Sequence, residues 1–280
     1  LQLQPCERHV ARRTVIGTMT MTPHQINLNA DLGESFGAWT MGDDSALLQI
    51  VKSANVACGF HAGDPTVMQT TVRQAIAQGV SIGAHPSYPD LQGFGRRVMQ
   101  MSAKDLEANL IYQIGALQAI AAAEGGCVTH VKPHGALHNV ACADAEVATT
   151  VVKGLRKLDS SLILLAPPYS TLAKAAEDAG QPVRYEVFAD RTYLDDGQLT
   201  PRSREGAVIH DSQACVSHVL RMLSAKAIVT ANGLHLPCRI DSICVHGDGP
   251  EAVATAQAIR LALEAAGYTL TALPQLGDDQ

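Results

Sequence analysis

The sequence predicts an α/β protein in which a mostly parallel sheet is closed, or partly closed, into a barrel. The first observation is that seven apolar, strand-like runs alternate along the chain with segments of helical periodicity. The second is that polar residues follow almost every run, so that many strand ends contribute chemistry, as they do in a barrel. An open doubly wound sheet gathers its ligands at one crevice, and the G-x-G-x-x-G motif of dinucleotide binding does not follow the first run. The barrel is therefore the favoured architecture.

Composition limits the class of protein. The chain has 280 residues, of which 46% are hydrophobic and 17% charged, so it can bury a sizeable core. No Ser/Pro-rich linker divides it, and one domain over residues 23–280 is the leading interpretation, although length alone also allows two. The formal net charge is -6 without a dense Lys/Arg cluster, which argues against nucleic acid or an anionic membrane as a partner. A small substrate suits the chain better.

The cysteines and the first residues bear on the compartment. The seven cysteines include no C-x-x-C pair, which indicates neither a zinc ribbon nor a disulfide framework and suits a reducing cytoplasm. No apolar run approaches the roughly 20 residues that span a bilayer. Residues 1–22 lack the apolar stretch of a secretory signal. We expect them to be a leader that is disordered or foreign to the natural chain, which would then begin at Met19 or Met21.

The strands are predicted from short apolar runs. The first alternates apolar and polar residues, whereas the fifth is fully apolar, as in a parallel strand that is covered on both faces. An Asn-Gly pair at Asn232 and Gly233 predicts a hairpin over 227–236, outside this series. The seven expected strands lie at 26–30, 55–58, 80–84, 127–132, 162–166, 183–188 and 243–245.

Helices are expected between the strands. Asp64 and Pro65 are suited to the cap and first position of one helix, and Ser102-Ala103-Lys104-Asp105 resembles a capping box before the clearest helix. Two connections, 85–101 and 189–210, exceed about 12 residues, and connections of that length are usually functional or disordered. The expected helices lie at 43–51, 65–78, 103–124, 145–158, 172–179, 216–223 and 251–266.

Acids and histidines end the first three strands. Asp31 and Glu34 could bind a metal or form an acid/base pair, while capping by Asp31 and solvation of Glu34 are the purely structural alternatives. His61 and His85 end the next two strands in matching contexts, and with Asp31 they could form an Asp/His/His site for a divalent metal. They could equally be hydrogen-bonding or packed histidines. Because widely spaced ligands lack the local signature of zinc motifs, we predict site membership without metal ligation.

A cation and an imidazole follow the fourth strand. Lys132 could neutralise developing charge on a carbonyl or phosphate, and His134 could transfer a proton. A lysine among apolar neighbours is costly without a partner, which weakens a purely structural role. His134 and His138 are four residues apart, but Gly135 makes a helix there doubtful, so we discount an H-x-x-x-H metal pair.

The last two strand ends complete the ring. Arg191 could clamp a phosphate or carboxylate with Glu186 as its inward partner, and a surface ion pair is the alternative. Asp190 lies beside Arg191. His246 and Asp248 follow the last strand, where Asp248 could simply cap a helix.

Nucleotide use cannot be derived from these residues. No Walker A sequence is present, and the loop around Arg97 matches no phosphate-binding motif, although its arginines could touch phosphate.

Together the motifs resemble the LamB/YcsF family over about residues 25–273. Six segments in order carry the resemblance, which makes it highly specific. They are NLNADLGE at 27–34, ACGFHAGD at 57–64, GAHPSYPD at 83–90 with GFGRR at 93–97, KPHGAL at 132–137, EVFADR at 186–191 and VHGD at 245–248. One departure is His138, which stands where a Tyr usually follows Ala-Leu and which we leave outside the predicted site.

The resemblance implies a distorted seven-stranded β/α barrel, similar to the glycoside hydrolase/deacetylase superfamily. It also implies ATP-dependent opening of the lactam of 5-oxo-L-proline to L-glutamate, with release of ADP and phosphate. In that family the chain would be the A subunit of a 5-oxoprolinase, with companion B and C subunits. ATP is then a co-substrate, and Mg²⁺ could accompany it, although these residues do not require a metal.

The implied chemistry fits the residues. Phosphorylation of the lactam oxygen would let water attack the carbon, which needs cations for the phosphate and a base for the water. The candidates are Lys132, Arg191 and Arg97 for the phosphate, and Asp31, His61 or His134 for the base. We predict as catalytic Asp31, His61, His85, Lys132 and His134, and as substrate- or phosphate-binding Glu34, Arg97, Glu186, Asp190, Arg191, His246 and Asp248.

Two other functions remain open. A metal-dependent hydrolase of amide or acetyl groups would contain bound metal and lose activity with a chelator. A non-catalytic, substrate-binding component of a larger enzyme would bind 5-oxoproline without hydrolysing it.

Overall fold

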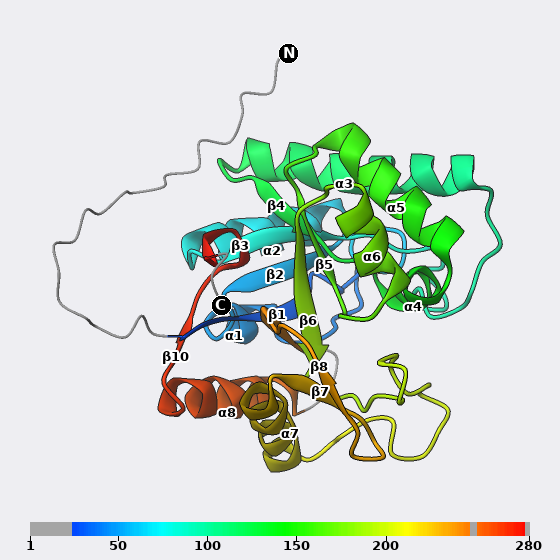
Figure 1. Ribbon diagram of the computed structural model, residues 1–280. Coiled ribbons are helices and arrows are strands. Elements are labelled where there is room, and N and C mark those ends of the chain that lie inside the picture. The colour runs from blue at the N-terminus through cyan, green and yellow to red at the C-terminus, as the bar shows by residue number, and fades with distance from the viewer. Residues whose placement is uncertain (1–23, 247–250, 278–280) are drawn as a thin grey trace, which may run out of the picture.

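The computed structural model describes residues 24–246 and 251–277, with a closed barrel of seven parallel strands at its centre (Figure 1). β9 pairs with both β6 and β1 and so closes the sheet, which confirms the predicted barrel. The predicted leader at residues 1–22 lies outside the described residues. The barrel strands are β1 (His24–Leu32), β2 (Ser53–Ala57), β3 (Ser81–His85), β4 (Val128–Val131), β5 (Ile163–Ala166), β6 (Val183–Phe188) and β9 (Ser242–Val245).

Helices cover the outside of the barrel. α3 and α5 lie side by side on one flank, and α7 and α8 on another (Figure 1). No helix in the described part of the chain is long and apolar enough to cross a membrane. The helices are α1 (Asp44–Leu48), α2 (Pro65–Ala77), α3 (Ala103–Ala123), α4 (Gly135–Ala143), α5 (Ala145–Leu158), α6 (Thr171–Asp178), α7 (Ser212–Ala225), α8 (Ala252–Ala265) and the 3-10 turn η1 (Leu273–Gln275).

Local signals placed several elements correctly. The Asp64 side chain accepts hydrogen bonds from the first turn of α2, and Ser102 accepts one from the amide of Asp105 at the start of α3. The Asn-Gly turn joins β7 (Ala227–Val229) to β8 (His235–Pro237) in an antiparallel hairpin. The predicted bounds of α5 and β6 match the observed ones, and Asp144 caps the start of α5.

The elements that were missed include α4 and β10. Gly135, interpreted as a helix breaker, is the first residue of α4, where its φ of +58° turns the chain from β4 into the helix. A Cβ there would lie 2.5 Å from the carbonyl oxygen of Gly95, so glycine also permits close packing of the 86–102 connection. β10 (Tyr268–Leu270) is a three-residue strand that adds to the edge of β1, and a partly exposed run so short gives no clear periodicity.

The interior of the barrel is polar, because β1 alternates two kinds of residue. Leu28 and Ala30 are buried and apolar, whereas Asn27, Asn29 and Asp31 alternate with them and make hydrogen bonds to neighbouring strands. Successive side chains of a strand point to opposite faces, so one face of β1 packs on the helices and the other builds a polar network inside the barrel. This network extends up to Asp31 at the carboxyl end of β1.

The network leaves no room beside His130. A Cβ on Gly83 of β3 would lie 2.2 Å from His130 Nε2, so we expect Gly83→Ala to lower the free energy of unfolding by about 1–3 kcal/mol through overpacking. Urea denaturation measures the change. Gly115→Ala in α3 is the matched control, because nothing lies within 4 Å of the added methyl group, and it should be neutral or stabilising. Equal effects of both substitutions would contradict this packing.

His130 also predicts a pH dependence of stability. Burial lowers the pKa of His130 to about 3, with a further contribution from Lys132, whereas the pKa of a histidine in an unfolded chain is about 6.5. Below a pH of about 6.5 the unfolded chain therefore binds a proton that the folded chain does not bind. The free energy of unfolding should fall toward pH 3 by up to about 1.4 kcal/mol per pH unit. Urea denaturation at several pH values should show a shallower dependence for His130→Gln. An unchanged slope would contradict the prediction.

Candidate active site

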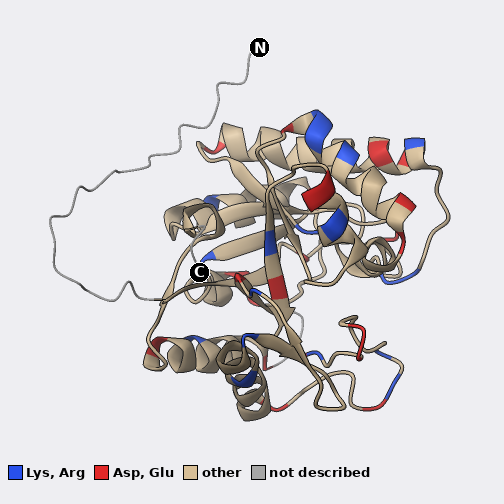
Figure 2. Ribbon diagram, viewed as in Figure 1, with Lys and Arg blue, Asp and Glu red and all other residues tan. Residues whose placement is uncertain are grey.

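A cavity of about 740 Å³ lies at the carboxyl ends of the barrel strands. Residues at the strand ends line it together with residues of the connections 86–102 and 189–211. Elsewhere, charged residues lie mainly on outer helices and loops, and most of the barrel ribbon is tan (Figure 2). The described lining residues that carry a charge or an imidazole are Asp31, Glu34, His85, Arg96, Lys132, His134, His138, Arg191, Asp196, Arg202 and His246.

The Lys132 ammonium is held at the base of the cavity by groups from three strands. Its Nζ donates to Asp31 Oδ1 at 3.0 Å and to Cys244 Sγ at 2.9 Å. Glu186 Oε2 lies 3.3 Å from the same Nζ, and the Lys132 side chain is only 2% exposed. The lysine expected to need a partner therefore has two carboxylates, which fix the ammonium in position.

These neighbours set the protonation states. Burial opposes the charge of Lys132, but Asp31, Cys244 and Glu186 outweigh it and hold the lysine pKa well above its ordinary value. Burial likewise opposes ionisation of Asp31, yet His85 and Lys132 hold its pKa well below the ordinary range. Burial raises the pKa of Glu186, and Lys132 offsets only part of this desolvation while the charge of Asp31 raises the pKa further. Lys132 and Asp31 thus form the ion pair of the site.

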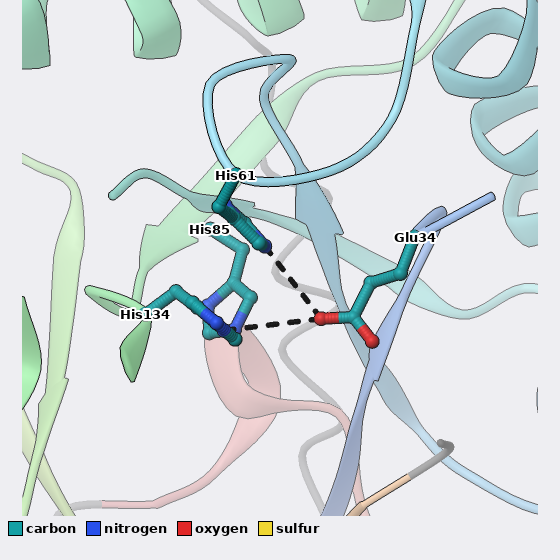
Figure 3. Close-up of side chains that lie close together, drawn as sticks. All are labelled: Glu34, His61, His85 and His134. Carbon is teal, nitrogen blue, oxygen red and sulfur yellow. Dashed lines mark hydrogen bonds and ion pairs between the residues drawn. The ribbon is translucent and has the colours of Figure 1, made fainter. Parts of the chain in front are cut away.

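A second group consists of Glu34, His61, His85 and His134, whose ligand atoms all lie within 4.8 Å of one another. Figure 3 shows His61 and His134 joined to the Glu34 carboxylate by dashed lines, with His85 beside His134. Glu34 Oε1 lies 3.6 Å from His61 Nε2 and 3.8 Å from His134 Nδ1. Burial lowers the pKa of His61 and of His134 well below the ordinary value, and neighbouring histidines lower it further, so both rings are neutral. We refer to these four residues as the histidine cluster.

The 86–102 connection is packed against this cluster. The carbonyl oxygen of Phe94 accepts a hydrogen bond from His134 Nε2 at 2.9 Å. A Cβ on Gly95 would lie 2.3 Å from Ser87 Oγ and 2.8 Å from His61 Cβ, so a residue larger than glycine would push the loop off the cluster. Arg97 turns away to Asp90, to which it donates, and anchors the loop. The long connection is thus an ordered wall of the cavity.

The opposite rim is formed by the ends of β6 and β9. His246 Nδ1 lies 2.8 Å from the Asp190 carboxylate, and its ring stacks on Phe188 with centroids 5.7 Å apart. Burial opposes ionisation of Asp190, but the contact with His246 helps to bring the pKa of this carboxyl below its ordinary value. Arg191 is 5% exposed and donates to the carbonyl oxygens of Thr200 and Ala207. These contacts order the start of the 189–211 connection.

Most of the predicted residues are brought together, with corrections to their partners. Glu186 does not pair with Arg191 as expected: it pairs with Lys132, because the inward face of β6 points to the barrel axis while Arg191 lies beyond the strand end. His61 and His85 are grouped with Glu34 and His134. The expected third member, Asp31, contacts His85, with Asp31 Oδ2 3.3 Å from His85 Nε2, but it also pairs with Lys132.

Other predicted residues lie apart from the cavity or outside the described chain. Arg97 is not among the lining residues, and its neighbour Arg96 is. Asp248 falls in 247–250 and lies outside the described residues. His138 lies in α4 after all, but its ring faces Phe188 and Cys142, so no metal pair forms with His134. The H-x-x-x-H pair is therefore ruled out by the orientation of the His138 ring, and not by the absence of a helix as expected.

The contributors missed by sequence reasoning include Cys244, Asp196 and Arg202. Cys244 contacts the lysine, and its position on the alternating inward face of β9 was the available signal. Asp196 and Arg202 lie on the 189–211 connection, where no periodicity indicates which side chains face the cavity. Their assignment requires the folded loop.

The fold and the cavity define a β/α-barrel protein with an enzyme-like site at the carboxyl ends of its strands. The profile of the LamB/YcsF family matches residues 26–277, nearly all of the described chain. The chain belongs to the LamB/YcsF family, as its six motifs predicted.

The relatives are similar over almost their whole length. The A subunit of 5-oxoprolinase from Azoarcus sp. (strain BH72) is 59% identical over 254 residues, which are 91% of this chain and 99% of that protein. The A subunit of 5-oxoprolinase from Brevibacillus brevis is 50% identical over 247 residues, 88% of this chain and 97% of that protein. A crystal structure of a lactam utilization protein from Thermus thermophilus is 43% identical, covers 89% of this chain and 100% of that one, and superposes with a TM-score of 0.84.

Proposed function

We propose that this chain is the A subunit of an ATP-dependent 5-oxoprolinase, which opens 5-oxo-L-proline to L-glutamate while ATP is hydrolysed to ADP and phosphate. The observation that carries the proposal is the 59% identity, along 99% of its length, to a protein named for that role. The companion B and C subunits are part of the proposal, as the designation of the relatives implies.

The charge of the cavity supports this substrate class. Its lining includes four cationic side chains, of Arg96, Lys132, Arg191 and Arg202, and three carboxylates, of Asp31, Glu34 and Asp196. A carboxylate-bearing lactam and a triphosphate are both anionic, and preorganised cations in a water-poor site stabilise the charge that develops during phosphoryl transfer. The cations of the lining are therefore suited to an anionic substrate.

The reaction can be written with these groups. The γ-phosphoryl group of ATP passes to the lactam oxygen and ADP leaves, which makes the ring carbon attackable. Water adds to that carbon and the C–N bond breaks as the ring nitrogen takes up a proton, which leaves a γ-glutamyl phosphate. A second water then hydrolyses this acyl phosphate to L-glutamate and phosphate. In this proposal Lys132 stabilises charge on the oxygen that is phosphorylated, and Asp31, ionised and 3.0 Å from Lys132, accepts the proton of the attacking water.

The test uses the purified chain with and without the B and C subunits. Titration calorimetry with 5-oxoproline and a coupled assay for ATP hydrolysis separate binding from turnover. We expect hydrolysis that depends on 5-oxoproline in the assembled complex. Binding of 5-oxoproline with no effect of the Lys132 and Asp31 substitutions on turnover would assign this chain a non-catalytic role, and amide hydrolysis without ATP would assign it to the metal-dependent amide hydrolases.

A further inference from the structure

The hydrogen bonds of the histidine cluster fix which nitrogens are bare. His85 Nδ1 donates to the carbonyl oxygen of Lys132 at 2.6 Å, and His134 Nε2 donates to that of Phe94 at 2.9 Å. A carbonyl can only accept, so each of these nitrogens carries the hydrogen. The other nitrogens, His85 Nε2 and His134 Nδ1, face each other at 3.0 Å, and Asp31 Oδ2 lies 3.3 Å from His85 Nε2. Two nitrogens without hydrogens would direct lone pairs at each other over that distance, so the contact requires a cation between them, either a proton or a metal ion.

The surroundings of His61 indicate that this cation is a metal ion rather than a shared proton. A proton between His85 and His134 would satisfy those two rings alone. His61 is 1% exposed, and neither of its ring nitrogens has a hydrogen-bond partner among the described residues. Buried polar atoms are nearly always satisfied, so a buried imidazole directed at a carboxylate and two other imidazoles points to a ligand at their centre.

The spacing of the donor atoms fits a metal ion. Glu34 Oε1 lies 3.6 Å from His61 Nε2 and 3.8 Å from His134 Nδ1, which is beyond ordinary hydrogen-bond length. Metal bonds of about 2.0–2.2 Å place neighbouring ligand atoms about 3–4 Å apart. The two histidine N–H groups that donate to carbonyls are also the outer contacts that orient metal-binding imidazoles.

We propose that Glu34, His61, His85 and His134 bind one divalent transition-metal ion. Three imidazoles and one carboxylate favour Zn²⁺, Co²⁺, Mn²⁺ or Fe²⁺, whereas Mg²⁺ prefers an all-oxygen shell. Glu34, His85 and His134 also line the cavity, so the ion faces the space where substrate would enter. Nitrogens committed to the ion cannot accept a proton, which leaves Asp31 as the base. The assignment does not rest on the proposed reaction, because binding of the ion is measured without substrate.

The test is a titration of the chelator-treated full chain with Co²⁺ alone, followed by visible absorption, with Zn²⁺ calorimetry in parallel. We expect one ion per chain and a ligand-field spectrum. Loss of a contact to the outer side of a metal ligand typically weakens metal binding by about 10–100-fold. Glu34→Gln and His61→Ala remove or alter a ligand itself, so each should weaken binding by at least that factor. His218→Ala is the matched control, because His218 is a buried histidine on α7 outside the cluster.

The outcomes are distinct. Glu34→Gln is nearly isosteric, so circular dichroism can establish that it is folded even if His61→Ala is not. Loss of the Co²⁺ spectrum in a folded Glu34→Gln variant, with retention in His218→Ala, supports the site. Absence of Co²⁺ uptake by the wild-type chain, unchanged affinity in Glu34→Gln, or displacement of Co²⁺ by excess Mg²⁺ overturns it.

Discussion

Replacing Lys132 by Met is expected to lower the 5-oxoproline-dependent turnover of the assembled complex by at least about 10²–10³-fold, the usual cost of removing one preorganised electrostatic group. The substitution also leaves Asp31 and Glu186 buried without their cation, and breaking a buried ion pair in this way costs about 3–5 kcal/mol of stability. Turnover per folded complex and urea denaturation measure the two effects separately.

A double variant separates catalysis from stability. Lys132→Met with Glu186→Gln removes the cation together with one of the buried carboxylates, so it should recover part of the lost stability without recovering turnover. Lys157→Met, at a lysine on the outer face of α5 whose side chain is 53% exposed, is the control and should change neither by much. Substantial turnover by the folded double variant would remove Lys132 from the catalytic role.

Asp31→Asn should lower kcat by about 10²–10⁴-fold, the range for loss of a positioned general base. The amide keeps the size of the side chain and an oxygen that can accept from Asn55 and Lys132, but it cannot take a proton from water. Steady-state kinetics on the assembled complex measure the change, and KM should change less than kcat because the charge is needed mainly in the transition state.

Asp241→Asn is the matched control for this substitution. Asp241 is buried like Asp31, but it precedes β9 at the amino end of the barrel, where it accepts from the amide of Tyr185 and pairs with Arg239. Its substitution should lower stability and leave kcat per folded complex unchanged. If Asp241→Asn and Asp31→Asn reduced kcat equally, the effect of Asp31 would be structural rather than chemical.

The barrel and the core of the site could be predicted because the strand ends indicate both the architecture and the positions of the site residues. Alternation along β1 places Asp31 on the same inward face as Asn27 and Asn29, and the apolar runs before His85 and Lys132 mark where β3 and β4 end. In a parallel barrel these ends meet on one rim, so strand position alone brings the groups together. No long-range information was needed for this part.

The partners within the site could not be predicted, because they depend on turns after the strands. Glu34 follows Gly33, whose φ of +72° redirects the chain and takes the carboxylate to the histidine cluster while Asp31 stays with Lys132. The choice of Arg96 over Arg97 depends in the same way on the fold of a loop that Asp90 holds. Sequence spacing does not encode such rotations, so it predicted the ring of residues and not its division into two groups.

The most direct test of the proposed function is the stoichiometry of products formed by this chain with the B and C subunits. The proposal predicts that L-glutamate and phosphate appear in equal amounts when 5-oxo-L-proline and ATP are both present, and that neither appears at a comparable rate when one of them is omitted. Glutamate formed without ATP, or phosphate released at the same rate without 5-oxoproline, would contradict the proposal that this chain serves an ATP-coupled opening of the lactam.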